Sequence, residues 1–398
     1  MISFEEAIST ISSLAQPFEK EYISLENAEN RILAENIYAD RDYPPFNRAA
    51  MDGYAIMLSD WNKGLRTYSI TEIIYAGDVS KSDLTSGHCY KIMTGAATPE
   101  TADVIIRKED THEINNEVSI IAETAKHFQN IALKGQDVKN QALILSAPHK
   151  CTPQTISLLA AVGKATLQVY KLPTVAVITT GNEVIAPGKP IAAHQIRNSN
   201  QFLLKALLKK WDITPQICEH IQDNKEALTK AFKEGIKNQL AIINGGVSAG
   251  DADYVPAVLK SLGVEMIFHK VKIRPGKPLW IGKTPTGGIV FALPGNPLSC
   301  LTTFTIFVED YLYKCFGFSN RPVYRFPLLE NRIKKHQLTD FFPVKINRLQ
   351  QGLNLIPYNG SGDITAGLDA SGLALQPDVT EEFKKEDIIS FYPFNNSL

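Results

Sequence analysis

The chain has 398 residues, of which 44% are apolar and 21% are charged, and its formal net charge is −1. This composition is typical of a soluble globular protein, and the length predicts roughly two to four domains. Bulk nucleic-acid binding is disfavoured because there is no basic excess to displace counterions. No apolar run approaches the ~20 residues that cross a bilayer. We therefore expect neither a nucleic acid nor a membrane as a partner.

The expected location is the cytoplasm. The amino terminus, residues 1–6, lacks the basic and apolar regions of a signal peptide. The five cysteines form no CxxC pair and stand among apolar neighbours. They are therefore expected to be buried thiols in a reducing compartment rather than a disulfide framework or a zinc site. These residues are Cys89, Cys151, Cys218, Cys300 and Cys315.

The first part of the chain is expected to combine helices with a small all-β domain. Residues 3 to about 39 carry apolar side chains at helical spacing. The pair Pro44-Pro45 ends this pattern and starts an extended segment. From 54 to about 145, short β-branched runs separated by turns predict strands. Residues 152–162 are predicted to be helical again, so the β domain interrupts a helical region built from both flanks.

Residues 174–318 are predicted to form an α/β domain. The run 175–179 is continuously apolar, which is typical of a strand in a parallel sheet covered on both faces. Asp223 and Glu226 have the spacing of a capping box and predict a helix start. Asn296 as cap, with Pro297 at the first position, predicts a long helix. Further strands are expected at 240–243, about 267–273 and 289–293, and helices at 199–211 and after 254.

The predicted fold class is multidomain α/β plus β. A central α/β domain is flanked by an inserted β domain and by a C-terminal β domain, which alternating apolar runs from 321 onward indicate. The predicted boundaries are 1–43 and 140–172 for an N-terminal helical and linker domain, 44–139 for the inserted β domain, 173–318 for the α/β domain and 319–398 for the C-terminal β domain.

A glycine-rich turn follows the strand at 240–243. Its glycines, Gly245 and Gly246 among them, let the backbone approach a phosphate closely, and Ser248 follows them. The aspartates of the turn, including Asp253, could hold a hard cation against that phosphate. Because ligands of open α/β sheets bind at the carboxyl ends of the strands, the turn predicts a phosphate and cation site.

Four other polar residues in loops each have two interpretations. Asp52 belongs to an Asp-Gly loop that is more often a simple turn, and Thr94 belongs to a segment that could be a hairpin connection. Glu183 follows the first strand of the α/β domain, where a structural and a functional role are equally good readings. For Asp223, a capping role alone would explain the residue.

The segment Arg274-Pro275-Gly276-Lys277-Pro278 predicts an oxyanion site. Two prolines around a glycine fix a rigid loop that carries two cations, so that little ordering entropy is lost when an oxyanion binds. A surface charge pair is the alternative. Placed beside Glu183 and the glycine-rich turn, these cations would complete a metal-plus-phosphate site.

Six motifs in order give the chain a resemblance to the molybdopterin molybdenumtransferase family, known as MoeA in bacteria and represented by the E domain of gephyrin. The resemblance covers essentially the whole chain. The motifs are Pro45-Phe46-Asn47-Arg48-Ala49-Ala50-Met51-Asp52-Gly53-Tyr54-Ala55, Met93-Thr94-Gly95-Ala96, Thr180-Gly181-Asn182-Glu183, the run from Gly245 to Tyr254, Pro275-Gly276-Lys277-Pro278 and Leu293-Pro294-Gly295-Asn296-Pro297.

The resemblance implies a transferase that takes adenylylated molybdopterin and molybdate, releases AMP and forms molybdenum cofactor with the help of Mg²⁺. It implies an elongated homodimer whose sites combine domains of both subunits, with the molybdopterin adenylyltransferase as a candidate partner. Carried over residue by residue, it assigns catalysis to Asp52, Thr94, Asp253 and Lys277, metal binding to Glu183, Asp223 and Asp253, and substrate binding to Gly245, Gly246, Ser248, Arg274, Lys277 and Ser361.

The chain departs from the family pattern at two places. Arg274 stands where a lysine is common, which keeps the charge but changes the hydrogen-bond geometry. The run 338–344 lacks an arginine and a second basic residue that many members carry, with Leu338 and Pro343 among its residues. Lys345 and Arg348 are the candidates to replace them.

Two alternative functions stay open. One is the preceding step, molybdopterin adenylyltransferase, whose enzyme has a similar α/β domain but is a single-domain protein, so the flanking β domains disfavour it. The other is a dimeric scaffold that has kept the fold and lost catalysis. The presence of Asp52, Glu183, Asp253 and Lys277 disfavours the scaffold.

Overall fold

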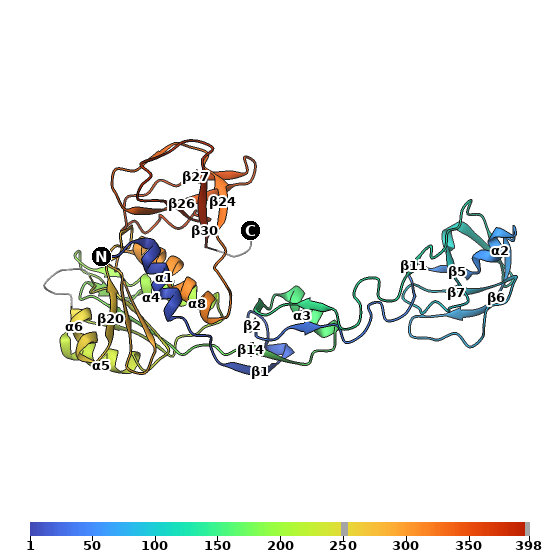
Figure 1. The fold of residues 1–398 in the computed structure, drawn as a ribbon, viewed down its shortest axis with the longest axis horizontal. Helices are drawn as coiled ribbons and strands as arrows, with labels where there is room; N and C mark the ends of the chain where they lie inside the picture. Colours follow the sequence, from blue (N-terminus) through green and yellow to red (C-terminus); the bar gives the residue numbers. More distant parts are fainter. Residues whose placement is uncertain (248–253, 395–398) are drawn as a thin grey trace. The chain divides into compact units, whose positions relative to one another are not determined.

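The structure, a computed structural model, describes residues 1–247 and 254–394. The chain divides into two compact units, one formed by 1–34, 150–152 and 167–398 and the other by 35–149 and 153–166 (Figure 1). Within the two described ranges, no helix combines the length and apolar character needed to cross a membrane. All five cysteines carry free thiols. The predicted burial is confirmed for four of them, whereas Cys218 is only partly buried.

A six-stranded sheet forms the centre of the first unit. The first four strands in spatial order are parallel to one another. Each of the last two, at one edge of the sheet, pairs antiparallel with the strand before it. In spatial order they are β18 (Ile217–Ile221), β15 (Val175–Thr180), β19 (Leu240–Asn244), β23 (Ile289–Leu293), β22 (Trp280–Lys283) and β20 (Glu265–His269).

Helices cover both faces of this sheet, as the continuous apolar run of β15 predicts. Every residue of β15 is buried, with Val175 and Val177 facing one core and Ile178 the other. The first face packs against α4 (Asn200–Lys209), and the second against α5 (Lys225–Gly235) and α6 (Tyr254–Ser261). The alternation follows from the two-residue period of a strand.

The N-terminal segment is helical only in α1 (Phe4–Leu14). The expectation of helix as far as about Ala39 is wrong beyond Leu14, because Pro17 disfavours further helix and the chain then enters sheets. The strands are β1 (Lys20–Ser24), β2 (Ile32–Leu33) and β3 (Ile37–Tyr38), with a short 3₁₀ turn at Leu25–Asn27. The apolar side of α1 joins the core of the α/β domain through fully buried Ala7 and Ile11.

The strands β1 and β2 belong to a small four-stranded sheet with the order β1, β14 (Thr166–Tyr170), β2 and β13 (His149–Lys150). Strand pairing between segments far apart in sequence thus replaces the predicted helix. The four-domain boundaries proposed from the sequence stay a prediction.

The second unit contains the predicted β domain. Its sheet has the order β8 (Val104–Arg107), β5 (Gly53–Ile56), β7 (His88–Ile92), β6 (Thr67–Ile74), β10 (Glu117–Ile120) and β9 (Thr111–Ile114). A short helix α2 (Leu58–Asn62) and a 3₁₀ turn (Lys108–Asp110) connect strands. The predicted second helix is α3 (Pro153–Ala161). Two small ladders pair β4 (Arg48–Ala49) with β11 (Ile131–Ala132) and β3 with β12 (Leu143–Leu145).

The C-terminal β domain belongs to the first unit and takes one strand from the α/β domain. Its sheet runs β21 (Ile273–Arg274), β26 (Thr339–Asn347), β28 (Gly372–Gln376), β30 (Ile388–Pro393) and β24 (Tyr324–Pro327), with β27 (Gly352–Leu355) also on β26. Two-stranded ladders join β25 (Arg332–Ile333) to β29 (Glu382–Phe383) and β16 (Val184–Ile185) to β17 (Ile196–Arg197). The predicted long helix is continuous through α7 (Pro297–Thr303), a π-helical turn (Phe304–Val308) and α8 (Glu309–Cys315).

Candidate functional site

A pocket of about 1160 Å³ lies in the first unit at the carboxyl ends of β15, β19 and β23. The chain leaves β15 for β18 on one side through α4 and returns to β19 on the other side through α5. Such a reversal of strand order opens a crevice at the strand ends, which is where ligands of open α/β sheets bind. The loop after Ile273 and a loop of the C-terminal domain complete the wall of the pocket.

The glycine-rich turn packs tightly against the end of β15. Gly245 and Gly246 have φ angles of 100° and 63°, which favour glycine. A Cβ on Gly245 would lie 2.8 Å from the carbonyl oxygen of Thr180, and one on Gly246 would lie 2.7 Å from Val255 Cγ2. Both glycines line the pocket, where their bare backbone is available to an anion. Ser248 lies outside the described residues.

Two of the three predicted metal ligands, Glu183 and Asp223, line this pocket. The capping role predicted for Asp223 is wrong, because Asn224 caps α5 by accepting hydrogen bonds from Glu226 N at 2.9 Å and Ala227 N at 3.2 Å. The amide of Asp223 instead donates to Asn182 Oδ1 at 3.0 Å, which ties it to the turn after β15. Helix capping therefore no longer explains Asp223.

The third predicted ligand, Asp253, lies outside the described residues. Within residues 1–247 and 254–394, no group of three His, Cys, Asp or Glu side chains is arranged to hold a metal ion. The described part of the site thus supplies two carboxylates, and carboxylate oxygens are the donors that a hard divalent cation prefers.

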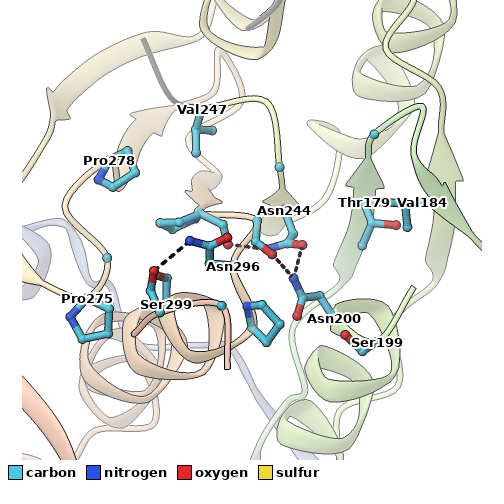
Figure 2. A pocket seen from close by; sticks show the side chains of 18 of the residues that line it. Thr179, Val184, Ser199, Asn200, Asn244, Val247, Pro275, Pro278, Asn296 and Ser299 are labelled. Carbon is cyan, nitrogen blue, oxygen red and sulfur yellow. Dashed lines mark hydrogen bonds between the residues drawn. The ribbon is translucent and has the colours of Figure 1, made fainter. Parts of the chain in front are cut away.

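A pair of asparagine amides forms part of the pocket floor (Figure 2). Asn200 Nδ2 donates to Asn244 Oδ1 at 2.9 Å and to the Gly295 carbonyl at 2.6 Å, while Asn244 Nδ2 donates to the Pro294 carbonyl at 2.8 Å. Because both of its N–H bonds are used, the Asn200 amide has one orientation, with Oδ1 left as an acceptor.

Two buried polar atoms of pocket residues have no protein partner among the described residues, Asn200 Oδ1 and Thr180 Oγ1. Unpaired buried oxygens are costly, and natural proteins keep them mainly where a ligand or solvent meets them. Sequence reasoning missed both. The residues stand at the start of the helix predicted from 199 and at the end of the strand predicted at 240–243, and nothing in the sequence joined the two.

Arg274 and Lys277 line the opposite part of the pocket with exposed side chains. The backbone at Arg274 is held in place because β21 pairs with β26, which puts Arg274 in register with Asp340. Gly276 has φ 106°, and a Cβ there would lie 2.5 Å from Thr303 Cγ2, so the loop packs closely on α7. The two cations predicted to face an oxyanion therefore stand on one rigid loop.

Ser361 reaches the pocket from a loop of the C-terminal domain. Its Oγ accepts a hydrogen bond from Asn296 Nδ2 at 2.8 Å, and its carbonyl accepts one from Leu298 N at 3.1 Å. Asp363 organises the loop by accepting from the Asn359 amide at 2.9 Å and from the amide and hydroxyl of Thr365 at 2.8 and 2.7 Å. These bonds lower the pKa of Asp363 to about 2, and the bond from the Asn359 amide has the largest effect.

Two basic residues of the C-terminal domain, Arg332 and His336, lie beside Asp340, the residue in register with Arg274. Both precede the run 338–344. Arg332 forms an ion pair with Asp340, and His336 Nε2 lies 3.7 Å from Asp340 Oδ1. Burial and the charge of Arg274 lower the pKa of His336, against the opposite effect of Asp340. The suggested replacements, Lys345 and Arg348, are not among the residues that line the pocket.

Asp52 and Thr94 lie in the second unit and contact each other. The Thr94 amide and hydroxyl both donate to Asp52 Oδ1 at 2.7 Å. Both hydrogen bonds lower the pKa of the Asp52 carboxyl, and the one from the hydroxyl has the larger effect. The structure thus joins two residues that the sequence placed 42 positions apart, and it holds an ionised carboxylate in a fixed orientation.

Known proteins resemble the chain over nearly its whole length. Residues 2–163 match the MoeA N-terminal region (domain I and II), and residues 176–314 match the probable molybdopterin binding domain. The molybdopterin molybdenumtransferase of Staphylococcus epidermidis is 32% identical over 398 residues, covering 98% of this chain and 94% of the relative. That of Haemophilus influenzae is 36% identical, covering 80% and 78%. The crystal structure of a molybdopterin biosynthesis MoeA protein from Pyrococcus horikosii is similar with a TM-score of 0.81 and 29% identity, covering both chains fully.

The fold, the pocket and these matches define an enzyme of molybdenum cofactor biosynthesis, a transferase with a molybdopterin-binding type of α/β domain. The chain belongs to the molybdopterin molybdenumtransferase family. The family resemblance inferred from six motifs and the predicted fold class are confirmed.

Proposed function

We propose that the enzyme inserts molybdenum from molybdate into adenylylated molybdopterin, and releases AMP and molybdenum cofactor. The observation that carries this proposal is the composition of one pocket. A glycine-rich turn and two carboxylates lie at the strand ends, and Arg274, Lys277 and Ser361 lie on the other wall. Such a pocket offers a place for phosphates and a separate place for a second oxyanion.

The strand-end side suits the phosphates and a magnesium ion. Gly245 and Gly246 offer backbone to a phosphate, and Glu183 and Asp223 would hold Mg²⁺ there, with Asp253 as the proposed third ligand. The fit rests on the oxygen donors of these two carboxylates, which line the pocket together with the glycine-rich turn. Bound Mg²⁺ would neutralise phosphate charge as the anhydride is cleaved.

The loop side suits molybdate. Arg274 and Lys277 can meet a dianion with charge-assisted hydrogen bonds, and Ser361 can add a donor without adding charge. The prolines Pro275 and Pro278 restrict the loop, so that little freedom is lost when the anion binds. In the proposed reaction, water takes the place of AMP on phosphorus. Two thiol S–H bonds are then exchanged for two Mo–S bonds, while one oxo group of molybdate leaves as water.

Asn200 and Thr180 would contact the organic part of the substrate. A fixed acceptor and an unpartnered hydroxyl suit the N–H and O–H groups of a pterin or a nucleoside. We further propose a cytoplasmic homodimer in which the Asp52–Thr94 pair of one subunit serves the pocket of the other, with the molybdopterin adenylyltransferase as the supplier of substrate.

The test is AMP release from adenylylated molybdopterin with and without molybdate. We expect release only when molybdate is present. Lys277→Ala should raise the molybdate concentration for half-maximal rate by roughly tenfold, the size of one lost charge-assisted hydrogen bond, and should weaken pterin binding less. Lys272→Ala is the matched control, because Lys272 is exposed near the same loop and does not line the pocket. Normal molybdate dependence with poor pterin binding in Lys277→Ala would move Lys277 to the phosphate side.

A further inference from the structure

Asn296 occupies the N-cap position of α7 and yet does not use its side chain as a cap. An asparagine at this position normally accepts a hydrogen bond from an amide of the first turn and stabilises the helix. Here its Nδ2 donates to Ser361 Oγ at 2.8 Å instead. Both side chains line the pocket. The sequence predicted the cap from the residue type, and the structure gives the asparagine a different bond.

Asn224 shows the ordinary arrangement in the same domain. Its Oδ1 accepts from Glu226 N at 2.9 Å and from Ala227 N at 3.2 Å, at the start of α5. The two asparagines thus hold equivalent backbone positions with opposite side-chain roles. Helix stability explains Asn224 but does not explain why position 296 carries an asparagine.

The bond from Asn296 fixes what the Ser361 hydroxyl can do. A serine hydroxyl has one hydrogen and can accept through its lone pairs. When Oγ accepts from Asn296, its own hydrogen stays available to donate toward the pocket. The backbone of Ser361 is held as well, by Leu298 N at 3.1 Å, and Asp363 orders the surrounding loop. The hydroxyl is therefore presented as a donor in a fixed place.

We propose that Asn296 is a positioning residue that makes Ser361 a dedicated hydrogen-bond donor to a tetrahedral oxyanion. The inference rests on the proposed function, because molybdate is the oxyanion that we place beside Arg274 and Lys277. An aspartate at position 296 would reverse the arrangement, since its carboxylate would accept a hydrogen bond from the Ser361 hydroxyl and add a negative charge near a dianion.

The experiment measures binding of sodium molybdate alone by calorimetry and the molybdate dependence of AMP release, on the full chain. Ser361→Ala should weaken molybdate binding about fivefold to tenfold and Asn296→Ala about threefold, as expected for losing or loosening one hydrogen bond. Asn296→Asp should weaken it at least roughly tenfold. In the Ser361→Ala background, Asn296→Ala should have no additional effect.

Thermal unfolding separates this positioning role from a role in helix stability. Asn224→Ala should lower Tm by roughly 2–4 °C, because it removes a used cap. Asn296→Ala should lower Tm by clearly less than Asn224→Ala, because the Asn296 side chain makes no capping bond and its one hydrogen bond, to Ser361, is exposed.

The inference is overturned if Asn296→Asp binds molybdate like the unaltered protein, or if Asn296→Ala has the same effect with and without Ser361. It is also overturned if the unaltered protein binds no molybdate. If molybdate binding follows the expected pattern but AMP release does not depend on molybdate, the positioning role stands and the proposed reaction fails.

Discussion

Thr179 and Thr180 are neighbours in β15 that should respond in opposite ways to the same substitution. The Thr179 hydroxyl is hydrogen-bonded to Asn198 Nδ2 and to His220 Nδ1, both at 3.0 Å. The Thr180 hydroxyl is buried, with 6% of the residue exposed, and has no partner among the described residues. Valine has nearly the shape of threonine, so each change to valine removes a hydroxyl and little else.

The expected changes in stability follow from these contacts. Thr179→Val leaves buried polar groups without a partner and should destabilise the protein by about 1–3 kcal/mol. Thr180→Val removes a group that is already unsatisfied, so stability should stay the same or rise by about 1 kcal/mol. The two variants are thus separated by about 1–4 kcal/mol, which corresponds to a Tm difference of roughly 2–16 °C for a domain of about 150–250 residues.

Thermal unfolding of the full chain without ligand measures the stability difference, and AMP release measures activity. We expect Thr180→Val to be at least as stable as the unaltered protein and roughly fivefold lower in kcat/KM, because the hydroxyl then no longer meets the substrate. A Thr180→Val protein as unstable as Thr179→Val would show that the hydroxyl is satisfied within the protein. Unchanged activity would remove Thr180 from the substrate site.

Three further outcomes are expected. Asp253→Asn should lower the rate of magnesium-dependent AMP release by a large factor while the protein stays folded, and an unchanged rate would exclude Asp253 as a ligand. Mixed inactive Asp52→Ala and Lys277→Ala proteins should regain activity once subunits exchange, and exchange without recovery would favour a site completed within one chain. Because the pKa of Asp363 is lowered to about 2 in the folded protein, its stabilising effect should be complete above the unfolded pKa of about 4 and lost as pH falls through 2. The Tm difference between the unaltered protein and Asp363→Asn should therefore disappear over that range, and a pH-independent difference would contradict this.

The parts of the fold that rest on local pattern were predictable. The apolar run of β15 gave a buried parallel strand, and Asn296-Pro297 gave the start of a helix at the observed residue. Strand period and helix-start preferences act within a few residues, so a single sequence contains them. The helical spacing after Leu14 misled because pairing of β1 with β14, about 145 residues further on, decides that segment.

The parts of the site that rest on distant contacts were not predictable. Nothing near Asn200 in the sequence indicates its bond to Asn244, and nothing near Arg274 indicates that β21 joins the sheet of the C-terminal domain. The prediction for Asp223 was wrong by one residue. The sequence predicted that Asp223 caps α5, but the cap is its neighbour Asn224. The motifs predicted that Glu183, the glycine-rich turn and the loop of Arg274 and Lys277 share one site, and all of them line the pocket. Only the fold could show which polar atoms of the pocket already have hydrogen-bond partners within the protein.

The most direct test of the proposed reaction counts products in a single turnover. Enzyme in excess over adenylylated molybdopterin is mixed with Mg²⁺, with and without molybdate, and both AMP and molybdenum bound to the pterin are quantified. We expect one AMP for each molybdenum incorporated, and no AMP above background when molybdate is omitted. AMP released at the same rate without molybdate, or molybdenum incorporated without AMP release, would contradict a single pocket that couples the two events.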